Sequence, residues 1–63
     1  MERHRLIAER RKELGLTQKQ LADQLGVRPS AISNYEIGIR RPRGKIAVKL
    51  SEILGIPLEE IIV

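Results

Sequence analysis

Apolar residues recur at helical spacing in two short stretches between Thr17 and Glu36, a segment that reads TQKQLADQLGVRPSAISNYE. Each stretch places its apolar residues at the 3.6-residue period, so that they share one face of a helix. The inward positions are Leu21, Ala22 and Leu25 in the first stretch and Ala31, Ile32 and Tyr35 in the second. The pattern therefore predicts two short amphipathic helices in succession.

Capping and helix-breaking residues separate the two helices. Thr17 is a favoured N-cap because its hydroxyl accepts a hydrogen bond from an unpaired backbone N–H. Gly26 ends the first helix, since glycine readily adopts a left-handed conformation, and Pro29 suits the first position of the next helix. With the small Ala22 where the helices approach most closely, this short connection predicts a helix-turn-helix at about residues 17–37.

Helical patterns also flank this segment. The expected bounds are Glu2–Leu14, Gly44–Leu54 and Pro57–Val63. The inward positions are Leu6, Ile7 and Leu14 in the first, Ile46, Ala47, Leu50, Ile53 and Leu54 in the second, and Leu58, Ile61 and Ile62 in the last. Gly15 and Gly55 are the expected stops of the first two helices.

The last helix has two interpretations. In one, its apolar residues close the bottom of a single core. In the other, Ile56, Ile62 and Val63 exceed what one small core needs and form part of a two-fold dimer contact. The sequence leaves both open.

The segments LTQKQLADQLGV and SAISNYEIGIRRP resemble the helix-turn-helix of the phage lambda repressor and Cro class of bacterial and phage regulators. The resemblance extends from about Arg11 to Ile62 without a gap. It implies an all-α fold, a compact bundle of five helices that forms one domain over residues 1–63. It also implies that the third helix, the recognition helix, enters the DNA major groove while the second crosses above the phosphates. The chain departs from the family at Arg43 and Gly44, which replace a capping hydroxyl and an apolar residue and weaken the next helix start.

Composition excludes several chemistries. The chain has 63 residues, no cysteine and a single histidine, His4. Neither a disulfide nor a thiolate zinc site is available, and so small a domain offers little room for a catalytic cleft. We therefore expect no metal and no cofactor. An enzyme is disfavoured, because the sequence has no nucleophile with a nearby base and no glycine-rich phosphate loop.

Charge is distributed unevenly along the chain. All twelve Lys and Arg residues fall within residues 1–49 together with five acids, whereas residues 50–63 carry three acids and no base. The division is +7 against −3, which indicates a basic face for a polyanion. No apolar run is long enough to cross a membrane and no secretory signal is visible, so we expect a cytoplasmic protein, nucleoid-associated when bound to DNA.

Several side chains are candidates for phosphate contact. Gln18 lies in the opening turn of its helix, where unpaired N–H groups attract phosphate, and the resemblance implies that it also braces the recognition helix. The resemblance further implies that Arg11 pairs with Glu36 and keeps its guanidinium near a phosphate. Tyr35 is expected to pack at the core edge with its hydroxyl on a phosphate. Arg10 and Lys12 are interpreted as a solvated helix end.

The loop IGIRRPRG is the most basic in the chain, with Arg40, Arg41 and Arg43. A solubilising loop is one explanation. The resemblance places this loop along the DNA backbone, where arginine forms forked hydrogen bonds to phosphate oxygens. For Arg43 the narrow minor groove is an alternative.

Base-reading candidates lie on the outward face of the recognition helix. They are Arg28, Pro29, Ser30, Ser33 and Asn34, followed on the same face by Ile37. Asn34 suits adenine, with which an amide forms two hydrogen bonds, whereas Ser33 accepts several partners and discriminates little. Pro29 offers only apolar contact, for example to a thymine methyl, and Arg28 suits guanine or phosphate.

These residues predict a sequence-specific transcriptional regulator, a repressor that binds a palindromic double-stranded DNA operator as a homodimer. Two alternatives remain open. One is an antitoxin that represses its own operon and binds a toxin. The other is a protein-interaction module that keeps the helical scaffold and binds a protein partner through its last helix or its basic face.

Overall fold

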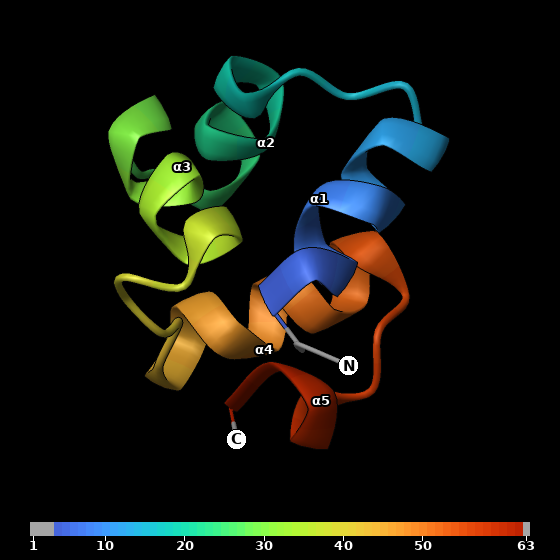
Figure 1. The fold of residues 1–63 in the computed structure, drawn as a ribbon, viewed down its shortest axis with the longest axis vertical. Coiled ribbons are helices and arrows are strands. Elements are labelled where there is room, and N and C mark those ends of the chain that lie inside the picture. Colours follow the sequence, from blue (N-terminus) through green and yellow to red (C-terminus); the bar gives the residue numbers. More distant parts are fainter. Residues whose placement is uncertain (1–3, 63) are drawn as a thin grey trace.

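Five α-helices build the part of the chain that the structure describes (Figure 1). The structure is a computed structural model, which describes residues 4–62. The helices are α1 (His4–Glu13), α2 (Gln18–Leu25), α3 (Pro29–Ile37), α4 (Gly44–Leu54) and α5 (Leu58–Ile62). Within this described range there is no strand, and the predicted all-α, five-helix fold is confirmed.

The start and end of α2 follow from its capping residues. The Thr17 hydroxyl oxygen accepts a hydrogen bond from the Gln20 backbone N–H at 3.0 Å, and the Gln20 side-chain oxygen accepts one from the Thr17 N–H at 2.8 Å. This reciprocal pair satisfies two N–H groups that the helix leaves unpaired. At the other end Gly26 has φ 72°, and Pro29 is the first residue of α3. The predicted N-cap, turn and restart are therefore confirmed.

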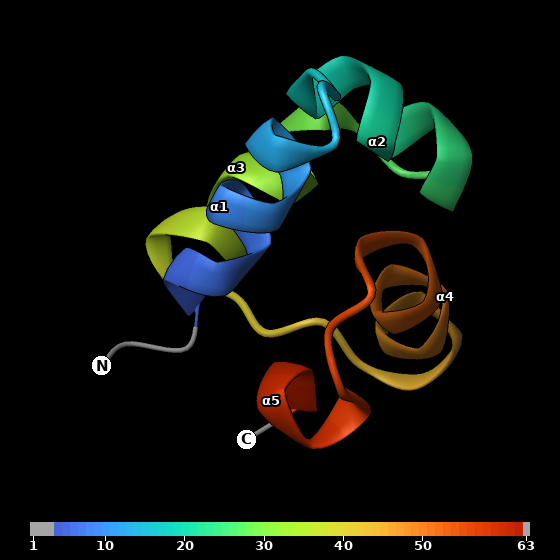
Figure 2. The same cartoon turned by 90° about the vertical axis from the view of Figure 1, so that its right-hand side faces the viewer.

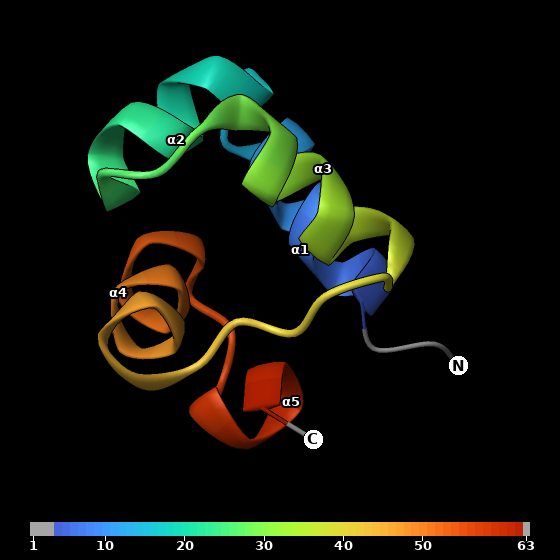
Figure 3. The same ribbon diagram turned by 90° about the vertical axis from the view of Figure 1, so that its left-hand side faces the viewer.

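Two helices, α1 and α2, flank α3. α1 and α3 pack against each other and overlap in the two opposite views of Figures 2 and 3, and α2 also packs against α3. α4 contacts α1, α2 and α5. As a result, α3 is held by α1 and α2, and its remaining face stays open to solvent.

Every helix contributes to one apolar core. Its buried members are Ile7, Leu21, Ala22, Leu25, Ile32, Tyr35, Ala47, Leu50, Leu54, Ile56 and Ile61. Leu21, Ile32, Leu50 and Leu54 are its largest fully buried side chains, and burial of such a side chain contributes about 1.5–3 kcal/mol. Most inward positions predicted from periodicity are confirmed.

Two predicted inward positions are wrong. Leu14 is 45% exposed, because α1 ends at Glu13 and Leu14 lies in the turn that follows. Leu58 is 37% exposed, because it is the first residue of the five-residue α5 and no helical turn precedes it, whereas Ile61 is buried. The predicted helix start at Glu2 lies outside the described residues.

Of the C-terminal residues that could belong either to the core or to a dimer contact, the structure places Ile56. Ile56 is only 5% exposed, so it packs in the core and is not spare apolar surface. Val63 and the side chain of Ile62, on which the dimer interpretation also relied, lie outside the described part of the chain.

Candidate nucleic-acid interface

A polar cluster joins α1, α2 and α3 at the carboxylate of Glu36. Arg11 Nε donates a hydrogen bond to Glu36 Oε2 at 2.5 Å, and Arg11 Nη2 donates one to Glu36 Oε1 at 3.1 Å. Gln18 Nε2 also donates to Glu36 Oε1, at 3.0 Å. The side chains of Arg11 and Glu36 are 10% and 7% exposed, and a forked, charged pair is strong in such surroundings. The cluster thus fixes the end of α3 against the two helices behind it.

The same hydrogen bonds limit what Arg11 and Gln18 have left for a ligand. A guanidinium has five N–H donors, and Arg11 also donates from Nη1 to the Leu16 carbonyl oxygen at 2.8 Å. Since Arg11 as a whole is only 8% exposed, it is chiefly an internal support. Gln18 is half-buried, and its amide nitrogen carries a second N–H that Glu36 does not use.

The open face of α3 carries the base-reading candidates. Arg28, Pro29 and Ser30 are exposed at its start, and Ser33 and Asn34 are half-buried one turn later. Among the hydrogen bonds of residues 4–62, none involves the side chain of Ser33 or Asn34. These two polar side chains are therefore not committed to the fold. Ile37, at the end of the helix, is 59% exposed.

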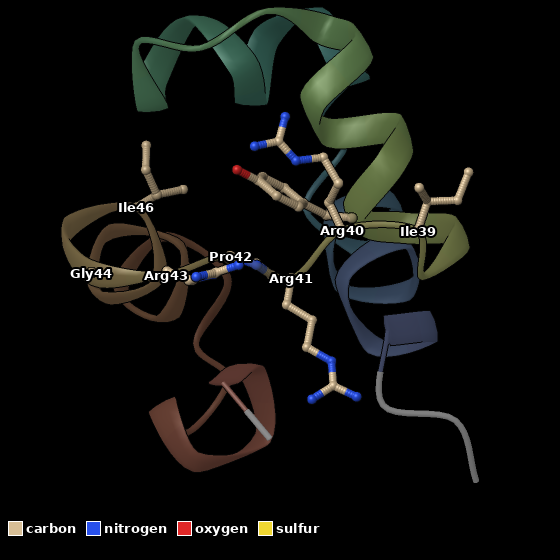
Figure 4. Close-up of a pocket in the computed structure, with 8 residues that line it drawn as sticks. Ile39, Arg40, Arg41, Pro42, Arg43, Gly44 and Ile46 are labelled. Carbon is tan, nitrogen blue, oxygen red and sulfur yellow. The ribbon is translucent and has the colours of Figure 1, made fainter.

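The basic loop after α3 borders a hollow of about 910 Å³ (Figure 4). Its lining includes the three arginines of the loop together with Tyr35 and Gly44. In Figure 4 the side chain of Arg40 points toward the helices of the helix-turn-helix, whereas that of Arg41 extends the opposite way, toward α5. All three arginines are exposed, while Pro42 between them is buried and anchors the loop. The guanidinium groups of Arg40 and Arg41 therefore lie at different places on the surface of the domain.

The helices before and after the basic loop, α3 and α4, both begin without a side-chain cap. Arg28 precedes α3 and Arg43 precedes α4, and neither side chain bonds the first-turn N–H groups. At the start of α4, Gly44 has φ 55°, a conformation that other residues adopt reluctantly. This is the weak helix start that the sequence predicts. Uncapped N–H groups beside arginines form a positive surface that suits phosphate.

Tyr35 is only 7% exposed and belongs to the core, which agrees with the prediction that it packs there. Because Tyr35 also lines the hollow of the basic loop, its hydroxyl-bearing side chain links the core to that surface.

Arg10 has a role that the sequence interpretation missed. Instead of being only solvated, it donates from Nε to the Leu54 carbonyl oxygen at 2.9 Å, and it pairs with Glu13. Its positive charge lies at the C-terminal end of α4, where the helix dipole is negative. The sequence holds no local signal for this contact, because the two residues are 44 positions apart.

Residues 4–62 contain no group of three or more His, Cys, Asp or Glu side chains able to hold a metal ion. None of the five helices is long and apolar enough to cross a membrane.

Two short helices joined at Gly26, with an open polar face on the second and a basic loop after it, define a helix-turn-helix domain. A family model described as a helix-turn-helix matches residues 7–61. The chain belongs to this family, of the lambda repressor/Cro type, which consists of DNA-binding domains and not of enzymes.

Comparison with known proteins gives relatives of two kinds. An uncharacterized HTH-type transcriptional regulator of Methanothermobacter thermautotrophicus is 44% identical over 50 residues, which cover 79% of this chain and 72% of that protein. Another from Bacillus subtilis, YqaE, is 41% identical over 49 residues, covering 78% and 42%. Multiprotein-bridging factor 1 of Eremothecium gossypii is 39% identical over 54 residues, covering 86% and 36%. The chain spans about a third of the length of the bridging factors that it matches.

Proposed function

We propose that the chain acts as a sequence-specific transcriptional regulator, a repressor that binds a palindromic double-stranded DNA operator as a homodimer. In this proposal residues 1–63 form one DNA-binding domain of a cytoplasmic protein, which associates with the nucleoid when bound. The observation that carries the proposal is the open face of α3, whose Ser33 and Asn34 side chains make no internal hydrogen bond and which is followed directly by a loop of three exposed arginines.

The arrangement supports a division between reading and positioning. Base edges carry sequence information, whereas phosphate contacts fix the register of the protein on the duplex. We assign base reading to the open face of α3, through Arg28, Pro29, Ser30, Ser33 and Asn34. We assign phosphate contact to Gln18, Arg11, Tyr35, Arg40, Arg41 and Arg43.

Within the phosphate set the contributions differ. Arg40, Arg41 and Arg43 are exposed and carry full charges, so they contribute most of the salt-dependent affinity. Arg11 is buried against Glu36, and its effect on DNA binding comes chiefly through the position of α3. Gln18 offers its second amide N–H from the first turn of α2.

A protein-interaction role is the second candidate. It is favoured by the name of a relative, multiprotein-bridging factor 1 of Eremothecium gossypii. An antitoxin is a variant of the first proposal, in which a toxin is the additional partner.

Selection of bound duplexes from a random DNA pool tests the main proposal. We expect enrichment of one motif repeated as an inverted pair, with half-site centres separated by about one helical turn, ~34–36 Å. Enrichment of a single unpaired motif would reject the dimeric arrangement while keeping sequence-specific binding. No enrichment over the starting pool would reject DNA reading and favour the protein-interaction role.

A further inference from the structure

An apolar groove lies between the end of α2 and the exposed side of α4, next to the basic loop. It has a volume of about 660 Å³ and is lined by Leu25, Gly44, Lys45, Ile46, Val48 and Lys49. We call it the α2–α4 groove. Val48 is 47% exposed and Ile46 is half-buried, so aliphatic surface of α4 is open to solvent here.

The rim of the groove is basic. Lys45 and Lys49 are exposed and four residues apart on α4, so their side chains stand one helical turn from each other. No acidic residue lines the groove. The exposed acid Asp23 on α2 is paired with Lys19 at 3.2 Å. The groove therefore combines an aliphatic floor with an uncompensated positive edge.

We propose that the α2–α4 groove binds an acidic amphipathic helix of a partner protein. A helix that docks in a groove uses apolar anchors at i, i+3, i+4 and i+7, which match an aliphatic floor of this kind. Acidic residues one turn apart beside those anchors would face Lys45 and Lys49. Such a helix would contact both the aliphatic floor and the basic rim of the groove.

Two other occupants fit the groove less well. A second copy related by a two-fold axis would bring its own Lys45 and Lys49 against the same residues, and like charges in contact are unfavourable. A DNA phosphate would bind more favourably to the neighbouring arginines of the loop, which offer forked hydrogen-bond donors. The aliphatic side chains of Ile46 and Val48 offer a phosphate no hydrogen bond.

The proposal is independent of DNA binding by α3. Gly44 and Ile46 line both the α2–α4 groove and the hollow of the basic loop, so a docked helix would lie beside DNA bound at that loop. The chain would then connect a partner protein to the DNA from adjacent surfaces of one domain.

The test is a titration of the full chain, labelled for methyl NMR, with two synthetic helical peptides. Both carry leucines at i, i+3, i+4 and i+7; one has glutamates beside them and the other has lysines. We expect the glutamate peptide alone to bind, with shifts at the methyl groups of Leu25, Ile46 and Val48. Absence of binding, or shifts centred on the methyl groups of Ile39 at the basic loop, would overturn the proposal.

A first pair of variants tests the floor. Val48→Asp should weaken binding of the glutamate peptide by about tenfold, because it removes an apolar anchor site and adds a repelling charge. Leu14→Asp is the matched control, since Leu14 has almost the same exposure, 45%, but lies after α1. Both residues are exposed, so both variants should fold, which circular dichroism checks. Equal loss of affinity in the two variants would contradict a specific groove.

A second pair tests the rim. The double change Lys45→Glu with Lys49→Glu should reverse the preference, so that the lysine peptide binds better. Arg5→Glu with Lys12→Glu alters the net charge equally at exposed positions of α1 outside the groove and should leave the preference unchanged. If both double variants reverse the peptide preference, the effect is one of net charge and the proposal is wrong.

A duplex titration separates this proposal from DNA binding. If duplex DNA shifts the groove methyl groups and Val48→Asp abolishes that binding, the groove belongs to the DNA interface and the proposal is overturned. If the glutamate peptide fails to bind while Val48→Asp still binds duplex normally, the groove proposal alone fails.

Discussion

Arg11 and Glu36, 25 residues apart in the chain, meet through two hydrogen bonds that connect α1 to the end of α3. Gln18 of α2 joins them at the same carboxylate. Three helices are thereby held in register by one acidic side chain. The consequence for binding is that the open face of α3 has a fixed orientation relative to the first turn of α2.

Arg11→Met should lower the free energy of unfolding by about 3 kcal/mol. The change leaves the Glu36 carboxylate, whose side chain is 7% exposed, without its charged partner. Loss of one member of a buried pair is costly because the other charge remains desolvated. Chemical denaturation monitored by circular dichroism measures the effect.

The double variant Arg11→Met with Glu36→Gln is the internal control. It removes both charges, so its cost should be smaller than the sum of the two single changes. Strict additivity would mean that the two residues do not interact in solution. Lys12→Met, at the exposed neighbouring position, should be nearly neutral.

Arg10→Met should cost about 1 kcal/mol. Arg10 Nε donates to the Leu54 carbonyl oxygen, one of the acceptors that the end of α4 leaves unpaired, and this bond is lost in the variant. The value is modest because the Arg10 side chain is 40% exposed. The same denaturation experiment applies. If Arg10→Met and Lys12→Met shift the midpoint equally, the bond to Leu54 makes no measurable contribution.

The sequence was informative where structure depends on neighbours along the chain. The cap at Thr17 and the turn at Gly26 follow from local backbone preferences. The weak start of α4 at Gly44 follows from a departure from the family pattern. The pair of Arg11 and Glu36 came instead from the family resemblance, since nothing local announces a contact between residues so far apart.

Features that depend on the assembled bundle escaped prediction. The bond from Arg10 to Leu54 needs the ends of α1 and α4 to meet. The α2–α4 groove requires Leu25 and Val48 to approach from different helices. Periodicity alone also placed Leu14 in the core, because a helical pattern does not reveal that the helix stops one residue earlier.

Thr17→Ala should destabilise the fold by about 1 kcal/mol. It removes the hydroxyl that accepts from the Gln20 N–H and so breaks one half of the reciprocal cap. Thr17→Ser keeps the acceptor and should retain most of the stability. Thermal unfolding of the two variants measures the difference. Equal melting temperatures for the alanine and serine variants would show that the cap does not matter for stability.

Arg40→Ala and Arg41→Ala should each weaken DNA binding whatever the sequence of the duplex. An arginine that neutralises one phosphate releases condensed counterions, so each loss should reduce the slope of log affinity against log salt by about one. The two side chains point in opposite directions, so we expect them to contact different phosphates (Figure 4). The slope of the double variant should therefore be reduced by about two. Titration of duplex at several salt concentrations gives the slopes. An unchanged slope for either variant would remove that arginine from the phosphate set.

Asn34→Ala should weaken DNA binding in a sequence-dependent way, because the amide of Asn34 is assigned to a base edge. An asparagine that pairs with adenine through two hydrogen bonds contributes on the order of 1–3 kcal/mol of discrimination. The variant should lose that amount on the preferred operator, much less on DNA altered at the contacted base pair, and it should keep the salt slope. The measurement compares matched and altered operators at several salt concentrations, with Lys12→Ala as an exposed control outside the interface. A uniform loss across sequences would make Asn34 a backbone contact. Sequence reading would then fall to Arg28, Ser30 and Ser33, or to the shape of the DNA.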